Sequence, residues 1–168
     1  VSSLGNCSTN NVVDYFVVAG GGGTFRQTSA GGGAGGFRLA NSKSLPAPTT
    51  SPLANPTGIT VTATAFPITV GAGGSPGPAG TAGGATSGSN SSFSTITSTG
   101  GGKGGTSGQG PGDQPGSPGG SGGGADYNTG HQTGGSGNTP PVSPPQGNNG
   151  GNAVYPGPTY GPGGGGGA

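Results

Sequence analysis

The chain has 168 residues and a net charge of +1, and 47 of its residues are glycine and 17 are proline. That composition is typical of fibrous or low-complexity chains rather than of ordinary globular enzymes. The few cations are scattered and form no basic stripe, so we expect no nucleic-acid partner. No apolar stretch is long enough to span a bilayer, so we expect no membrane insertion.

A side-chain core alone cannot order such a chain. Only 24% of the residues are hydrophobic, whereas fixing each backbone residue costs about 1–2 kcal/mol, and glycine lies at the costly end. A backbone hydrogen bond contributes about 1 kcal/mol net. We therefore expect either a fold in which nearly every amide is paired or a disordered Gly/Pro linker.

Residues 1–11, VSSLGNCSTNN, are small and polar and predict an extended N-terminal arm. Cys7 is the only cysteine, which excludes an internal disulfide and leaves a buried thiol or an inter-subunit disulfide as alternatives. The chain begins with Val1 instead of methionine, which favours a removed signal peptide and therefore secretion.

The strongest strand signal is VVDYFVVA, residues 12–19, which is β-branched and aromatic on both faces apart from Asp14. Such a strand requires cover on both sides. It runs directly into the glycine block of residues 20–36. Residues 37–57 predict an irregular excursion that contains several prolines.

Further along the chain, residues 59–70 alternate between apolar residues and threonine, which predicts a half-buried strand. Pro67 should place the end of this strand at a sheet edge or divide it in two. A third short strand is predicted at residues 93–97. No segment has helical periodicity, so we expect essentially no α-helix.

Glycine recurs at every third position from Gly71 to Gly83, and again in two shorter runs. These runs are too short and too far out of phase for collagen. A period of three also fits polyglycine II, a left-handed extended helix that has three residues per turn and no internal hydrogen bonds. Without Cβ atoms, such helices can pack closely and pair their amides laterally. We therefore predict a single glycine-rich domain over residues 12–168, with short strands followed by a polyglycine II bundle.

The order of the motifs VVDYFVVAGGGG, GGGAGGFR, ITVGAGG, SGSNSSF, PPQGNNGG and GPGGGGGA resembles the glycine-rich domain of bacteriophage tail-fibre adhesins and related bacterial extracellular proteins. The resemblance spans about residues 12–168. It implies strands that lead into packed polyglycine II helices, with exposed variable loops that contact a host receptor. It implies no catalytic residues. This chain is richer in proline than the family pattern, and only eleven residues precede Val12.

The residues argue against an enzyme or a cofactor site. One histidine, His131, three aspartates and Cys7 are too few for a metal site. A catalytic pair of Cys7 and His131 would need an apolar pocket for which the sequence offers little material. Glycine loops that bind phosphate open a helix and carry Lys-Ser/Thr, which Lys103 in GGGKGG lacks.

Two sets of residues are candidates for contacts. Tyr127, Tyr155 and Tyr160 either pack over exposed glycine backbone or form a contact platform for a saccharide or a neighbouring subunit. The strand at residues 12–19 either lies within its own subunit's sheet or is donated to the next subunit. The predicted subunit interface comprises Val12, Val13, Tyr15, Phe16, Val17, Val18, Ile59 and Val61.

The hypothesis favoured by the sequence is a secreted structural protein that polymerises with itself, head to tail, into an extracellular filament. The short segment before Val12 favours a chain that is itself the repeating unit. The alternative is a phage tail-fibre adhesin domain that recognises a bacterial surface saccharide or receptor.

Overall fold

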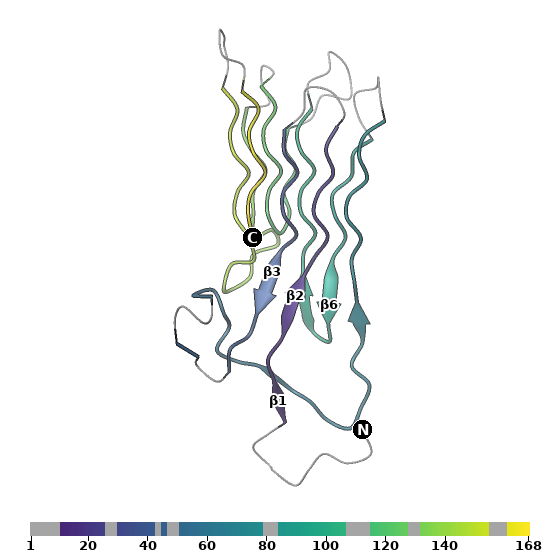
Figure 1. The fold of residues 1–168 in the computed structure, drawn as a ribbon, viewed down its shortest axis with the longest axis vertical. Coiled ribbons are helices and arrows are strands. Elements are labelled where there is room, and N and C mark those ends of the chain that lie inside the picture. Colours follow the sequence, from purple (N-terminus) through teal and green to yellow (C-terminus); the bar gives the residue numbers. More distant parts are fainter. Residues whose placement is uncertain are drawn as a thin grey trace.

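Two kinds of structure make up the computed structural model, short strands at one end and extended glycine-rich runs along the rest (Figure 1). No helix is present among the residues that the structure describes. The structure describes residues 11–25, 30–42, 45–46, 51–78, 84–106, 115–127, 132–154 and 161–168.

The strands of the described part form small antiparallel sheets. β1 (Val12–Val13) pairs with β4 (Ile59–Thr60), β2 (Phe16–Val18) pairs with β3 (Phe37–Leu39), and β6 (Ser91–Phe93) lies between β5 (Ile68–Thr69) and β7 (Ile96–Ser98).

The prediction of one strand over residues 12–19 is wrong in its continuity. β1 places Val12 opposite Thr60, whereas β2 places Phe16 opposite Leu39, so the chain changes partner between them. The change occurs at Asp14, where the Oδ1 atom accepts a hydrogen bond of 2.8 Å from the backbone N–H of Ser42. A side-chain acceptor at this point ties the chain to the excursion after β3.

The other strand boundaries also need correction. The segment 59–70 is two strands, as the alternative of a division at Pro67 predicted, but β4 already ends at Thr60 and β5 begins only after Pro67, which cannot donate to a ladder. The predicted strand 93–97 spans the β6–β7 hairpin turn, where Ser94 has a φ of 53°. The excursion predicted for residues 37–57 begins with a strand, since β3 continues the pairing with β2.

A small side-chain core lies where the two larger sheets meet. Tyr15 and Val17 are buried together with Ala40, and Phe93 and Ile96 pack against them from β6 and β7. Ile59 of β4 completes the cluster. The two-stranded sheet β2–β3 therefore packs on the three-stranded sheet β5–β6–β7.

Beyond this core, the strands continue into glycine-rich extended segments, which we call the glycine runs. Figure 1 shows them as wavy traces that lie side by side above the strands. The glycine runs comprise residues 19–25, 30–36, 70–78, 84–90, 99–106, 115–119, 121–127, 132–138, 147–154 and 161–168.

Hydrogen bonds join each glycine run laterally to its neighbours. Gly22 donates to Gly33 over 2.8 Å, Gly33 donates to Gly102 over 2.8 Å, and Gly102 donates to Ser121 over 2.9 Å. One series of bonds therefore crosses four different runs. Such lateral pairing is the pattern expected of packed polyglycine II helices.

Glycine is required where the runs approach most closely. A Cβ atom on Gly100 would overlap the carbonyl oxygen of Gly88, and one on Gly123 would overlap that of Lys103. By contrast, a Cβ atom on Gly164 would meet no atom within 4 Å. The predicted fold class, short strands leading into glycine-rich runs without α-helix, is confirmed. The boundary between an arm at residues 1–11 and a domain at 12–168 stays a prediction, because residues 1–10 lie outside the described residues.

Candidate functional site

The ends of the glycine runs that lie farthest from the strands are together at one end of the bundle (Figure 1). We call this end the turning end. Gly77 donates to Thr24 over 3.0 Å, and Ala30 donates to Gly105 over 3.1 Å. Val154 donates to Gly161 over 3.0 Å. These bonds join residues that lie within two positions of segments outside the described part. The ends of several runs are therefore held together at this end of the bundle.

Tyr127 lies at the turning end, as the last described residue of its run. It is half-buried, whereas the preceding Asp126 is fully buried.

The run that carries Tyr127 contacts the two runs that enter and leave residues 155–160. Ala125 donates to Gly151 over 2.9 Å and accepts from Gly163 over 2.7 Å. Tyr155 and Tyr160 themselves lie outside the described residues, as do Cys7 and His131. The topology brings the three runs of the predicted tyrosine platform together, and the platform itself stays a prediction.

At the strand end, the residues predicted for a subunit interface are partly paired within one chain. Val13 lies opposite Ile59 in the β1–β4 ladder, and the N–H of Val61 donates to the carbonyl of Asn11 over 2.6 Å. Val12 is paired with Thr60 in the same ladder. A strand exchange between subunits would have to replace these internal pairs.

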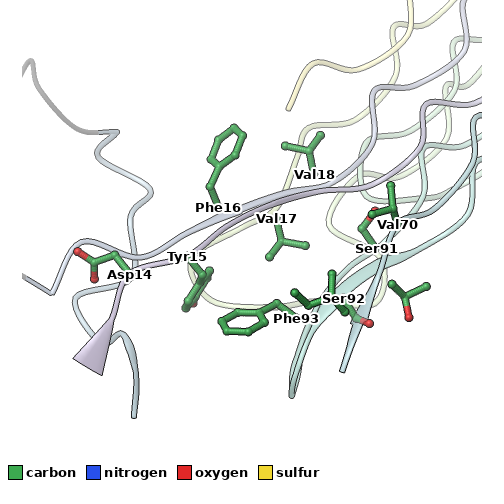
Figure 2. Close-up of a pocket in the computed structure, with 11 residues that line it drawn as sticks. Asp14, Tyr15, Phe16, Val17, Val18, Val70, Ser91, Ser92 and Phe93 are labelled. Atoms are coloured by element: carbon green, nitrogen blue, oxygen red, sulfur yellow. The ribbon is translucent and has the colours of Figure 1, made fainter. Parts of the chain in front are cut away.

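The β2 residues of the predicted interface divide by face. Tyr15, just before β2, and Val17 point inward and are buried in the core, whereas Phe16 and Val18 point outward and are 67% and 44% exposed. Figure 2 shows the alternation, with Phe16 and Val18 on one side of β2 and Val17 and Tyr15 on the side of Phe93. The cover that the sequence predicts for both faces is present on one face only.

A groove of about 340 Å³ lies between β2 and the sheet edge formed by β5. Its lining is mostly apolar, and Asp14 is the only charged residue in it. Sequence reasoning missed Ile68, Val70 and Phe93 as members of this surface. The ITV run before Gly71 was the available signal, but nothing in the sequence places it beside β2. The lining residues are Asp14, Tyr15, Phe16, Val17, Val18, Ile68, Thr69, Val70, Ser91, Ser92 and Phe93.

The described part of the chain contains no group of three or more His, Cys, Asp or Glu residues that could hold a metal ion. Nor does it contain a helix long and apolar enough to cross a membrane.

Comparison with known proteins gives one match. Residues 4–168 match a family model described as a glycine-rich domain. No curated protein and no solved structure matches the chain.

Proposed function

The chain belongs to the glycine-rich domain family, and we propose that it acts outside the cell, as a rigid scaffold that recognises a bacterial surface receptor at its turning end. In this proposal the domain is the receptor-binding part of a virion tail fibre or of a cell-surface adhesin. It carries out no reaction.

The observation that supports this proposal is the common level of the run ends. The bonds Gly77 to Thr24, Ala30 to Gly105 and Val154 to Gly161 hold the ends of several runs together at one end of a laterally bonded bundle. Binding residues are often found on connections that a rigid scaffold positions. A bundle of this kind lets the connections vary in sequence without loss of the packed glycine backbone.

The segments that connect successive glycine runs at the turning end have a sequence that suits recognition of a ligand better than packing of the bundle. Their side chains include charged and aromatic groups, which are rare in the glycine runs, among them Arg26, Asp113, His131, Tyr155 and Tyr160. Aromatic rings with a polar end are favoured at contact surfaces because they bury area and also hydrogen-bond. We infer that the receptor is a surface saccharide or a protein that presents a polar, ring-sized epitope.

Cell binding tests this proposal. The labelled domain is applied to a panel of bacterial strains and to their purified surface polysaccharides, as wild type and as Tyr127→Ala, Tyr155→Ala and Tyr160→Ala. We expect wild type to bind at least one strain, and at least one tyrosine variant to bind it about tenfold more weakly, since a contact worth about 1.4 kcal/mol is lost.

The matched control is Phe16→Ala, which removes an exposed aromatic ring at the strand end. Its cell binding should equal that of wild type. Tyrosine variants that all bind as wild type, or a panel on which wild type binds nothing, would refute the receptor function.

A second candidate is the self-assembling extracellular filament. The β1–β4 ladder supports it, because Val12–Val13 and Ile59–Thr60 form a pair of only two residues each at the end of the molecule. So short a ladder is readily exchanged between chains, which would link them head to tail. Negative-stain electron microscopy of the purified protein tests it, and fibres that persist after deletion of residues 1–11 would exclude a role for that arm.

A further inference from the structure

The edge of β2 that faces away from β3 is open. Tyr15 accepts a hydrogen bond from Ala40 over 2.9 Å, and Ala19 donates to Gly36 over 3.0 Å. Hydrogen-bonded pairs alternate along an antiparallel ladder, so the N–H and C=O groups of Phe16 and Val18 point away from β3. Neither amide donates to another described residue.

The outer edge of β5 is open for the same reason. Ser94 donates to Pro67 over 2.9 Å, which makes Thr69 opposite Ser92 the next hydrogen-bonded pair. The backbone groups of Ile68 and Val70 therefore point away from β6. Two unpaired strand edges border the groove described above (Figure 2).

The groove exists because two neighbouring segments of the chain separate between the glycine bundle and the strand end. The continuations of β2 and β5 are directly bonded, since Gly74 donates to Gly21 over 2.8 Å. At the level of the strands, no Cα atom of β2 lies within 8 Å of a Cα atom of β5. The sheet β2–β3 has two strands and the sheet β5–β6–β7, on which it packs, has three, so no described strand lies beside β2 and over β5.

Apolar side chains surround this position. Ile68 is 70% exposed and Val70 is 85% exposed on β5, and Val18 and Phe16 are exposed on β2. Exposed apolar residues that gather at one place commonly mark an interaction site. Apolar side chains together with unpaired backbone edges specify an extended strand as the ligand, because β-augmentation uses both.

We propose that this groove binds one extended β-strand donated by another polypeptide, which pairs with the open edge of β2 and covers β5. The strand alternates apolar and small polar side chains. It carries a lysine or arginine at the end beside Asp14, the only charge in the lining. A single strand fits better than a second copy of the domain, because β2 of a second copy is attached to β3 and would bring a whole sheet edge into the recess.

The proposal does not depend on the receptor function, since the groove lies at the strand end and the receptor contacts at the turning end. The probe is a short capped peptide of alternating threonine and valine with a lysine at one end. Its control is the same peptide with N-methyl groups on consecutive amides, which blocks pairing along both of its edges. Binding to the isotopically labelled full chain is followed by NMR titration and by amide hydrogen exchange.

We expect saturable binding that slows exchange of the Phe16 and Val18 amides and leaves Val17, already paired with β3, unchanged. N-methylation should abolish binding. Val70→Lys and Ile68→Lys should weaken binding by about tenfold or more through lost apolar contact and the burial of a charge. Val154→Lys, at a site that is 59% exposed at the turning end, should bind the peptide as wild type does.

Three results would overturn the proposal. One is the absence of saturable binding, and another is equal binding of the N-methylated peptide. The third is protection of the Phe16 and Val18 amides in the chain without peptide, which would mean that a second copy or the chain's own residues 1–10 already occupy the groove. Sedimentation at increasing concentration and deletion of residues 1–10 distinguish those two occupants.

Discussion

The strand end and the glycine bundle hold together in different ways although the same chain segments run through both. At the strand end, Tyr15 and Val17 are buried against Phe93 and Ile96, as in an ordinary small core. In the bundle, fully buried residues such as Ala125 and Ser121 are small apart from Asp126, and backbone bonds join the runs. The first region is stabilised by apolar side chains and the second by paired amides.

The difference explains why a strong strand ends in glycine. The partnership of β2 with β3 continues into the bundle, where Ala19 donates to Gly36 and Gly22 donates to Gly33. The number of neighbours changes at this point. A strand has backbone partners on two sides only, whereas Gly22 also lies against the carbonyl of Gly102 from another run. Side chains beyond Ala19 would occupy the space that those neighbouring backbones fill.

The largest expected effect comes from adding one methyl group inside the bundle. Gly100→Ala places a Cβ atom on the carbonyl oxygen of Gly88, and neither backbone can move without breaking lateral bonds. We expect the free energy of unfolding to fall by about 3 kcal/mol or more. Denaturant unfolding followed by tyrosine fluorescence measures the loss.

The matched control is Gly164→Ala, at an exposed position where a Cβ atom meets nothing within 4 Å. Its stability should stay within about 0.5 kcal/mol of wild type. If both variants unfold alike, close backbone packing is not what holds the bundle.

The sequence predicts the division between these regions well. The apolar run of residues 12–19, followed by a glycine block, marks the place where side-chain packing gives way to backbone packing. The three-residue glycine spacing from Gly71 predicts polyglycine II, and the lateral hydrogen bonds between the runs fit that prediction. Both features are local, and local periodicity is what a single sequence records most clearly.

Which strands and glycine runs pair with each other could not be predicted, because this pairing depends on contacts between residues that are distant in the sequence. The residues near Asp14 in the sequence do not indicate that its carboxylate accepts a hydrogen bond from the Ser42 N–H and that the strand is divided there. The groove depends on the separation of two runs that are bonded at Gly21 and Gly74 but apart at the strands. Such separations follow from the whole topology and from no single motif.

A second prediction concerns a large buried side chain, Gln146, that links the two regions. Gln146 is 1% exposed; its Oε1 atom accepts from the Thr99 N–H over 2.8 Å, and its Nε2 atom donates to the Pro140 carbonyl over 3.0 Å. Gln146→Ala leaves both groups without these partners, which should cost about 2–3 kcal/mol. Asn149→Ala, which removes an exposed bond to the Gly137 N–H, should cost less than about 1 kcal/mol in the same unfolding assay. Equal losses would show that burial of the amide is unimportant.

A third prediction tests the side-chain core with two residues of the same type. Val17 is buried and Val18 is exposed on the same strand. Val17→Ala should cost about 2 kcal/mol, from two lost methyl groups and the cavity they leave, whereas Val18→Ala should cost less than about 1 kcal/mol. Thermal unfolding of the two variants side by side makes the comparison, and a larger loss for Val18→Ala would mean that the outward face of β2 is covered in solution.

The smallest expected effect lies at the border between the two regions, at Ser98. Its side chain is fully buried at the end of β7, and its hydroxyl donates to the carbonyl of Val17 over 2.7 Å. This bond joins the two packed sheets at the last position before the glycine runs begin. Ser98→Ala removes one neutral donor and leaves the Val17 carbonyl with its ladder partner, so the cost should be about 1 kcal/mol. Thr97→Ala, on the exposed side of the same strand, should change stability by less than about 0.5 kcal/mol. A loss at Ser98 as large as that at Gly100 would mean that side-chain hydrogen bonds, and not the glycine backbone, fix the register in which the runs enter the bundle.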